Sequence, residues 1–157
     1  MTPAVQLLKK QKISFQLHEY EVDMNGSGYG NAVAEYLGVP EQQLFKTLII
    51  TPDDQHSRLA MAIVPVAFSL NLKAAAKALG WKKAQLADQQ KAQKATGYIV
   101  GGISPLGQKQ RLPAIIDRSC EALDTLFFSA GKRGLQIELA PQVLIKLINA
   151  QLADIQG

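Results

Sequence analysis

The spacing of apolar residues near the N-terminus changes from a helical to a strand period. Thr2 followed by Pro3 is typical of a helix start, and the apolar face behind them predicts a helix over residues 3–11. From Ile13 onward, apolar and polar residues alternate, which predicts a strand that reaches Tyr20. The chain therefore opens with one helix and one strand.

The middle of the chain carries the clearest strand signals. Residues 45–51 and 59–66 are apolar, branched runs separated by the polar turn 52–57. This arrangement predicts two paired strands, antiparallel and central in a sheet. Further short strands are expected over residues 98–101, 113–117, 125–129 and 135–139.

Helix signals fill most of the intervening segments. A glycine-rich loop over residues 24–30 precedes a helix expected from Asn31 to Gly38. Two more helices are predicted from their capping residues, one over 72–79 and one from 88 to 95. Asn71 and Asp88 are the N-caps and Gly80 and Gly97 the stops, and Pro141 opens a last helix to about Leu152.

This order of elements indicates the fold class. Helices and strands interleave, but the strands cluster and many links are short. We therefore expect a mixed α+β fold with a mixed or largely antiparallel sheet, rather than regular βαβ winding. No internal repeat or long linker divides the sequence, so residues 1–157 are expected to form one domain.

Composition narrows the setting in which the chain works. Hydrophobic residues make up 47% and charged residues 19%, which argues against disorder. No apolar run approaches the roughly 20 residues that a membrane span needs. The N-terminus lacks the features of a secretory signal, and the single cysteine, Cys120, excludes an internal disulfide. We expect a cytoplasmic protein without membrane association.

The charge balance is mildly basic. The formal net charge is +4 and the pI about 9.2, which fits a polyanionic partner such as RNA. Many small domains carry this charge and bind no nucleic acid, so both interpretations stay open at this point.

Few residues could serve as metal ligands or nucleophiles. The chain has two histidines, His18 and His56, and neither has a partner at metal-ligand spacing, so no metal site is expected. His18 is expected to be a surface or half-buried residue. Cys120 lies beside Glu121, which raises a thiol pKa, and we interpret it as structural.

Two glycine turns invite comparison with phosphate-binding loops. Residues 102–107 have the two-glycine spacing of a P-loop, but Gln108 replaces the required lysine. Residues 129–134 carry Lys132 and Arg133 on a glycine turn between strands. This turn could either bind a phosphate or be a tight hairpin with solvated cations, and spacing alone does not choose between them.

Lys46 is the least expected residue of the apolar strand 45–51. A lysine at the start of a strand can extend its ammonium into water. Alternatively, it points into a cleft, where it binds a phosphate or polarises a carbonyl. Residue pattern alone favours the first interpretation.

Three blocks of sequence together resemble the YbaK/EbsC family, the free-standing relatives of the editing domain of bacterial prolyl-tRNA synthetase. The blocks are Phe-Lys-Thr-Leu at 45–48, Thr-Gly-Tyr-Ile-Val-Gly-Gly-Ile-Ser-Pro-Leu-Gly at 96–107, and Gly-Lys-Arg-Gly at 131–134. The resemblance runs nearly end to end. It implies a mixed, barrel-like sheet surrounded by helices, and the removal of cysteine from Cys-tRNA(Pro) and, less selectively, Cys-tRNA(Cys).

The same resemblance implies which residues form the site. Lys46 is the functional hallmark, while Tyr20 and the turn from Gly101 to Ser104 line its pocket. It implies action without cofactor or metal, and transient association with prolyl-tRNA synthetase. One segment departs from the family pattern, since residues 30–34 lack the acidic residues that follow this glycine in relatives.

The resemblance also implies a mechanism that requires no strong protein nucleophile. In this hypothesis the thiol of a cysteinyl ester attacks its own carbonyl and releases the tRNA, leaving a cyclic thiolactone that water opens, while the protein supplies position and charge. We expect Lys46 to be the cationic anchor, Gly101 and Gly102 N–H groups to hold the carbonyl oxygen, and Tyr20 to orient the α-amino group or ribose. The further expected substrate-binding residues are Phe45, Thr47, Ile103, Ser104, Pro105, Ser129, Gly131, Lys132 and Arg133.

Two other functions stay open. The same fold could act on another mischarged tRNA, such as Ala- or Ser-tRNA, or it could bind RNA without catalysis. For the deacylase, the basic residues near 73–83 and 132–133 are the expected contacts to the tRNA backbone.

Overall fold

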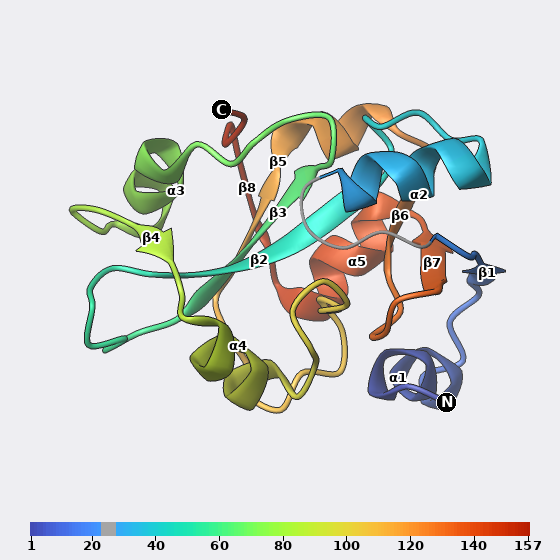
Figure 1. Cartoon of the computed structure of the whole chain (residues 1–157), viewed down its shortest axis with the longest axis horizontal. Helices are drawn as coiled ribbons and strands as arrows, with labels where there is room; N and C mark the ends of the chain where they lie inside the picture. Colours follow the sequence, from blue (N-terminus) through green and yellow to red (C-terminus); the bar gives the residue numbers. More distant parts are fainter. Residues whose placement is uncertain (23–27) are drawn as a thin grey trace.

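The computed structural model describes residues 1–22 and 28–157, and it arranges them as two sheets with helices around them (Figure 1). The elements, in chain order, are α1 (Pro3–Lys10), β1 (Gln16–Glu19), α2 (Tyr29–Leu37), β2 (Phe45–Thr51), β3 (Ala60–Pro65), α3 (Leu72–Leu79), β4 (Gln85–Leu86), α4 (Gln89–Thr96), β5 (Ala114–Asp117), the short 3₁₀ helix η1 (Arg118–Ala122), β6 (Leu126–Ser129), β7 (Leu135–Leu139), α5 (Pro141–Ile148) and β8 (Gln151–Ala153).

The larger sheet has five strands in the order β4-β2-β3-β5-β8. β2 and β3 pair antiparallel from Phe45 opposite Pro65 to Ile50 opposite Ala60, which confirms the predicted central pair. β5 and β8 then add in parallel orientation. The sheet is therefore mixed.

The smaller sheet is antiparallel, with the order β1-β7-β6. It meets the larger sheet at the start of β2, where the Phe127 N–H donates to the Gln43 carbonyl at 2.9 Å. A parallel bridge between Leu44 and Phe127 lies at the same point. The predicted mixed fold is thus confirmed, with its sheet divided into two parts that join at β2.

The main core lies beneath the sheets and is aliphatic. Every residue of β3 is buried, and Ile63 and Ile116 are fully buried on adjacent strands. Phe128 of β6 and Leu8 of α1 close the same core from the smaller sheet and the N-terminal helix. Burying each such side chain contributes about 1.5–3 kcal/mol, which fixes β2 and its neighbours as a rigid frame.

The predicted helix caps are confirmed. The Thr2 hydroxyl accepts from the Val5 N–H, and the side chains of Asn71 and Asp88 accept from backbone N–H groups three residues ahead. Gly80 and Gly97 end their helices in the left-handed conformation. Such caps satisfy N–H groups that the first helical turn leaves unpaired.

One predicted strand does not form, and three boundaries differ from prediction. The strand expected over 98–101 is wrong, because Tyr98 is buried with its hydroxyl bonded to the Leu106 carbonyl, and the next residues form a turn. The last helix ends at Ile148, after which Asn149 turns the chain into β8. β1 begins at Gln16 rather than Ile13, and α2 begins at Tyr29 rather than Asn31.

The glycine-rich loop predicted over 24–30 lies mostly outside the described residues. Gly28 is the N-terminal cap of α2. No helix in the described ranges is both long and apolar enough to span a membrane.

Candidate active site

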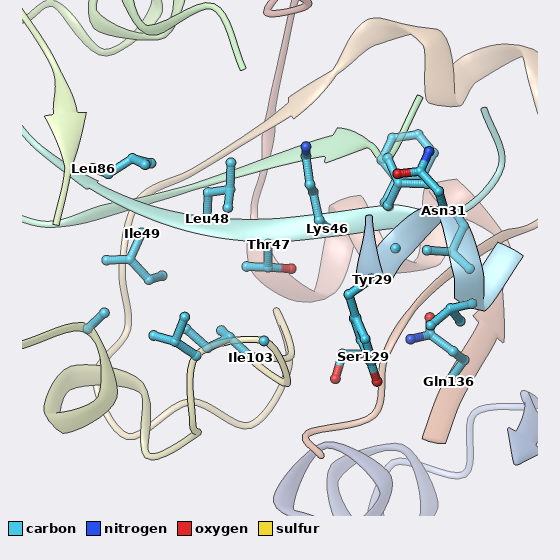
Figure 2. A pocket seen from close by; sticks show the side chains of 18 of the residues that line it. Tyr29, Asn31, Lys46, Thr47, Leu48, Ile49, Leu86, Ile103, Ser129 and Gln136 are labelled. Carbon is cyan, nitrogen blue, oxygen red and sulfur yellow. The ribbon is translucent and has the colours of Figure 1, made fainter. Parts of the chain in front are cut away.

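A cavity of about 390 Å³ lies along one edge of β2 (Figure 2). Five consecutive residues, 45–49, line it. Successive side chains of a strand point to opposite faces, so consecutive residues can share one cavity only at the strand's edge. Figure 2 shows this directly, since Lys46 and Leu48 extend to one side of β2 and Thr47 and Ile49 to the other.

The register of β2 decides which backbone groups face the cavity. The Val66 N–H donates to the Leu44 carbonyl at 2.8 Å, so Leu44 directs its backbone groups toward β3. In an antiparallel pair every second residue does the same, and the residues between them face the opposite way. Thr47 is one of these, so its N–H and C=O point toward the cavity.

Neighbouring strands occupy only the two ends of this edge. At one end Gln43 pairs with β6, and at the other the Ala87 N–H donates to the Ile49 carbonyl at 2.9 Å. β4 pairs no further, because the next residue, Asp88, caps α4 and turns the chain away. No strand among the described residues pairs with β2 at Thr47, and the cavity is this gap in the sheet.

Lys46 carries the only charge that the described residues place in the cavity lining. Burial lowers the pKa of its ammonium. Within the described residues no carboxylate forms an ion pair with it. A partly desolvated cation without an internal partner is suited to an anionic or strongly polar ligand.

Two buried oxygens in the lining lack hydrogen-bond partners among the described residues. They are Oγ1 of Thr47 and Oε1 of Gln136, and Gln136 is only 5% exposed. An unsatisfied buried polar group costs about 1–3 kcal/mol, and these two oxygens are available to a ligand or an ordered water. The nearby Ser129 hydroxyl accepts from the Gly131 N–H at 3.1 Å.

Tyr29 lines the cavity and contacts Tyr20 and Arg133, which lie outside the lining. Its hydroxyl lies 2.6 Å from that of Tyr20, and the Arg133 guanidinium lies 4.3 Å from the centre of its ring. Tyr20 is only 5% exposed and does not itself line the cavity. Burial raises the pKa of Tyr29, so its phenol is neutral and can donate a hydrogen bond.

Two turns pack closely beside the cavity. A Cβ at Gly102 would lie 3.1 Å from the Lys132 backbone, and one at Gly131 would lie 2.6 Å from the Tyr98 ring. The Gly102 N–H donates to the Ile99 carbonyl at 2.9 Å. These glycines allow the turn over 131–134 to support the turn that carries Gly101.

The predicted site residues fall into two groups. Ser104 is fully buried and accepts from the Leu106 N–H, so it stabilises its own turn. Those that line the cavity are Phe45, Lys46, Thr47, Gly101, Ile103 and Ser129. Those that lie outside the lining are Tyr20, Gly102, Ser104, Pro105, Gly131, Lys132 and Arg133.

Sequence reasoning missed several lining residues. Tyr29 lies in a glycine-rich stretch without a recognisable motif, and Gln136 and Leu86 come from strands distant in sequence from β2. Asn31, in the segment that departs from the family pattern, also lines the cavity and donates to Glu41 at 2.6 Å. Only the tertiary structure brings these side chains together.

Cys120 and His18, which the sequence did not favour as catalytic residues or metal ligands, lie outside the cavity lining. Cys120 is fully buried, and burial raises the pKa of its thiol to about 11, which confirms a structural residue. His18 is half-buried, as expected, with Nε2 2.9 Å from Glu138. Within the described ranges, no three His, Cys, Asp or Glu side chains are grouped as a metal site requires.

Comparison with known proteins identifies the fold and the family. Residues 29–147 match the family described as "Aminoacyl-tRNA editing domain". This chain belongs to that family. The editing domain is 34% identical, over 98% of its length, to the "Putative Cys-tRNA(Pro)/Cys-tRNA(Cys) deacylase EbsC" of Enterococcus faecalis, and it covers 92% of that protein.

One further relative and one solved structure are similar to this editing domain. Over 64% of its length it is 29% identical to a proline–tRNA ligase of Trichlorobacter lovleyi, of which it covers 17%. It shares its fold with a solved structure titled "a putative trans-editing enzyme for prolyl tRNA synthetase", with a TM-score of 0.84 at 20% identity. That match covers 100% of this chain and 98% of the other.

Proposed function

We propose that this editing domain removes cysteine from mischarged Cys-tRNA(Pro), and less selectively from Cys-tRNA(Cys), acting in trans. Membership of the editing family supports tRNA as the substrate, and the name of the Enterococcus relative supports the amino acid. One feature of the cavity carries the proposal. Among the described residues that line it, none is His, Cys, Asp or Glu, whereas a partly buried lysine is present.

The reaction therefore draws its nucleophile from the substrate. The cysteinyl sulfur bonds to the ester carbonyl carbon, the bond to the ribose oxygen breaks, and the thiol proton passes to that oxygen. Water then opens the resulting thiolactone to free cysteine. The protein contributes by holding sulfur and carbonyl in reach of each other and by stabilising the developing negative charge.

Lys46 is the cationic anchor for the ester or the adjacent phosphate. Gly101 lines the cavity, and its N–H donates to the carbonyl oxygen in this mechanism. The Gly102 N–H does not take this role, because it already bonds to the Ile99 carbonyl. The Thr47 N–H, at the open edge of β2, is the second donor.

The α-amino group of the substrate has acceptors in the same cavity. Oε1 of Gln136 and Oγ1 of Thr47, which lack partners among the described residues, accept hydrogen bonds from it. Tyr20 acts as a positioning residue through Tyr29 rather than by touching the substrate. The α-ammonium is thus bound by neutral oxygens within the described lining.

A panel of substrates tests the proposal. The protein is given Cys-, Ser- and Ala-tRNA(Pro), and release of each amino acid is followed. We expect rapid loss of cysteine only, because serine and alanine lack the thiol. Equal rates on all three would refute the thiol-assisted route and favour a broader deacylase, while tRNA binding without loss of any ester would favour a non-catalytic module.

We also propose a protein partner and a cellular location for this editing domain. A cavity of this size can bind the aminoacyl end of a tRNA but not the parts that distinguish one tRNA from another. We therefore propose transient association with prolyl-tRNA synthetase, which selects the tRNA. Both proteins would act in the cytoplasm, where translation occurs. Co-purification of the two proteins in the presence of tRNA(Pro) tests the association. The basic candidates for tRNA backbone contact are Lys73, Lys77, Lys82, Lys83, Lys132 and Arg133.

A further inference from the structure

The cavity has two chemically different ends (Figure 2). Polar side chains gather at one end and aliphatic side chains at the other, with Lys46 between them. The polar end includes Ser129 and Gln136, and the apolar end includes Leu48 and Leu86. An ester whose carbonyl lies near Lys46 must place its acyl part in one end and its alcohol part in the other.

Exposed side chains lie at both ends of the cavity. At the polar end Gln136 is 5% exposed, whereas Asn31 is exposed. At the apolar end Leu86 is 57% exposed and Val100, bonded to α4 beside it, is 40% exposed. A tRNA has to continue from its terminal ester to the outside, and Leu86 and Val100 offer its terminal nucleoside an apolar surface on the way out.

Leu86 and Val100 are held in place by their backbones. Leu86 pairs with Ile50 in the sheet, and the next N–H bonds to the Ile49 carbonyl. The Val100 N–H donates to Oε1 of Gln93 on α4 at 2.9 Å. Both side chains therefore present apolar surface at a fixed position beside the cavity.

We propose that this apolar end binds the terminal nucleobase of the tRNA, with Leu86 and Val100 packed against the base and the aminoacyl group in the polar end. The inference rests on the proposed function and sets the direction of the substrate in the cavity. The flat faces of a base are weakly hydrated and pack on apolar side chains, whereas an α-ammonium requires the oxygen acceptors of the other end.

Charge near the apolar end fits the phosphates that follow the base. Lys82 and Lys83 are exposed and immediately precede β4, and Lys91 is exposed on α4. Two carboxylates lie near them. Asp88 accepts from the Lys91 N–H, and Asp54 accepts from the side-chain amide of Gln85 at 2.8 Å. The chain that flanks Leu86 is therefore basic, as a polyanionic exit path requires.

Two small esters separate the base from the rest of the substrate. One is the cysteinyl ester of adenosine and the other is cysteine ethyl ester, which has no base. Leu86→Ser and Val100→Ser should each raise KM for the adenosine ester about fivefold, and leave cleavage of the ethyl ester unchanged. Ile99→Ser is the matched control, because Ile99 is 73% exposed on the same turn but does not line the cavity.

A binding measurement keeps this result independent of catalysis. AMP titrated into the labelled protein should shift the methyl resonances of Leu86 and Val100, and both substitutions should weaken its binding. Equal KM changes for both esters would assign the apolar end to the amino acid and overturn the inference, as would AMP binding without shifts at these methyls. If AMP shifts them but neither ester is cleaved, the base site stands and the proposed function fails.

Discussion

At the scale of single residues, burial and charge oppose each other at Lys46. Its side chain emerges from an apolar strand, and burial lowers the pKa of its ammonium. A surface lysine would avoid this cost by extending into water, which the residue pattern had favoured. The structure instead places Lys46 in the lining of a cavity, where a charged group is retained at the expense of stability.

Replacing Lys46 with methionine should therefore separate stability from activity. Lys46→Met keeps the apolar stem and removes the charge, so we expect a melting temperature about 1–3 °C above wild type and complete loss of deacylation. Because the pKa is lowered in the folded state, the cost is full while the lysine is protonated and is relieved as pH rises through that pKa. Melting at pH 7 and pH 10 should show the gain shrinking at the higher pH.

A Lys46→Met protein that melts below wild type at pH 7 would contradict this balance. Lys46→Arg serves as the charge-preserving control, since it keeps the cation but changes its shape.

The hydroxyl pair of Tyr20 and Tyr29 gives a second prediction at this scale. Tyr20→Phe removes one partner of the 2.6 Å contact and should cost about 1 kcal/mol of stability. Since Tyr20 acts through Tyr29, the Tyr20→Phe/Tyr29→Phe double variant should raise KM no more than the larger single change. Additive losses in a kinetic cycle would mean that Tyr20 has an independent role.

At the scale of elements, features that depend on residues near in sequence were predicted better than strand pairings between distant segments. Asn71 and Asp88 are caps whose partners lie three residues away, and β2 and β3 adjoin in sequence. β4 and β8 have only two and three residues, and their pairing depends on strands far along the chain. Strands of two or three residues are too short to show a recognisable alternation of apolar and polar residues.

The same limit applies to the site. A motif identified Lys46, whose neighbours Phe45 and Thr47 then follow from the strand. Gln136 reaches the cavity only because β7 joins β6 and β6 joins β2. The turn around Ile99 had an apolar pattern that favoured a strand, although its apolar side chains are exposed at the cavity mouth.

The packing of two turns gives a prediction at this scale. Gly131 has φ +112° and a Cβ there would lie 2.6 Å from the Tyr98 ring, whereas Gly80 has φ +75° and open space around it. Gly131→Ala should cost roughly 2–3 kcal/mol and lower deacylation, because the supporting turn must move. Gly80→Ala should cost about 1 kcal/mol and leave activity intact, and urea unfolding of both variants checks the difference.

At the scale of the whole molecule, the net charge of +4 favours binding of the polyanionic tRNA. The Lys132–Arg133 turn lies against the turn that carries Gly101, so a tRNA end in the cavity passes near it. Each phosphate contact contributes to the fall of affinity with salt. We therefore expect the position of these cations beside the cavity to affect tRNA affinity more than the net charge of the protein does.

Lys132→Ala should weaken tRNA binding and lower the slope of log K against log salt by about 1. Lys146→Ala removes the same charge from α5, which contributes no residue to the cavity lining, and should leave the slope unchanged. Binding measured across a range of KCl concentrations distinguishes them. Identical slopes for both variants would show that overall charge, and not the turn, sets the salt dependence.

The gap beside β2 also suggests how the enzyme could be inhibited. Along this gap the backbone N–H and C=O of Thr47 pair with no neighbouring strand among the described residues. β6 pairs with one end of the same edge of β2, and β4 pairs with the other. An extended peptide analogue laid in that gap would complete the sheet and bind through main-chain hydrogen bonds. Such an inhibitor would recognise the backbone of β2, so side-chain substitutions in the lining would do little to make the enzyme resistant.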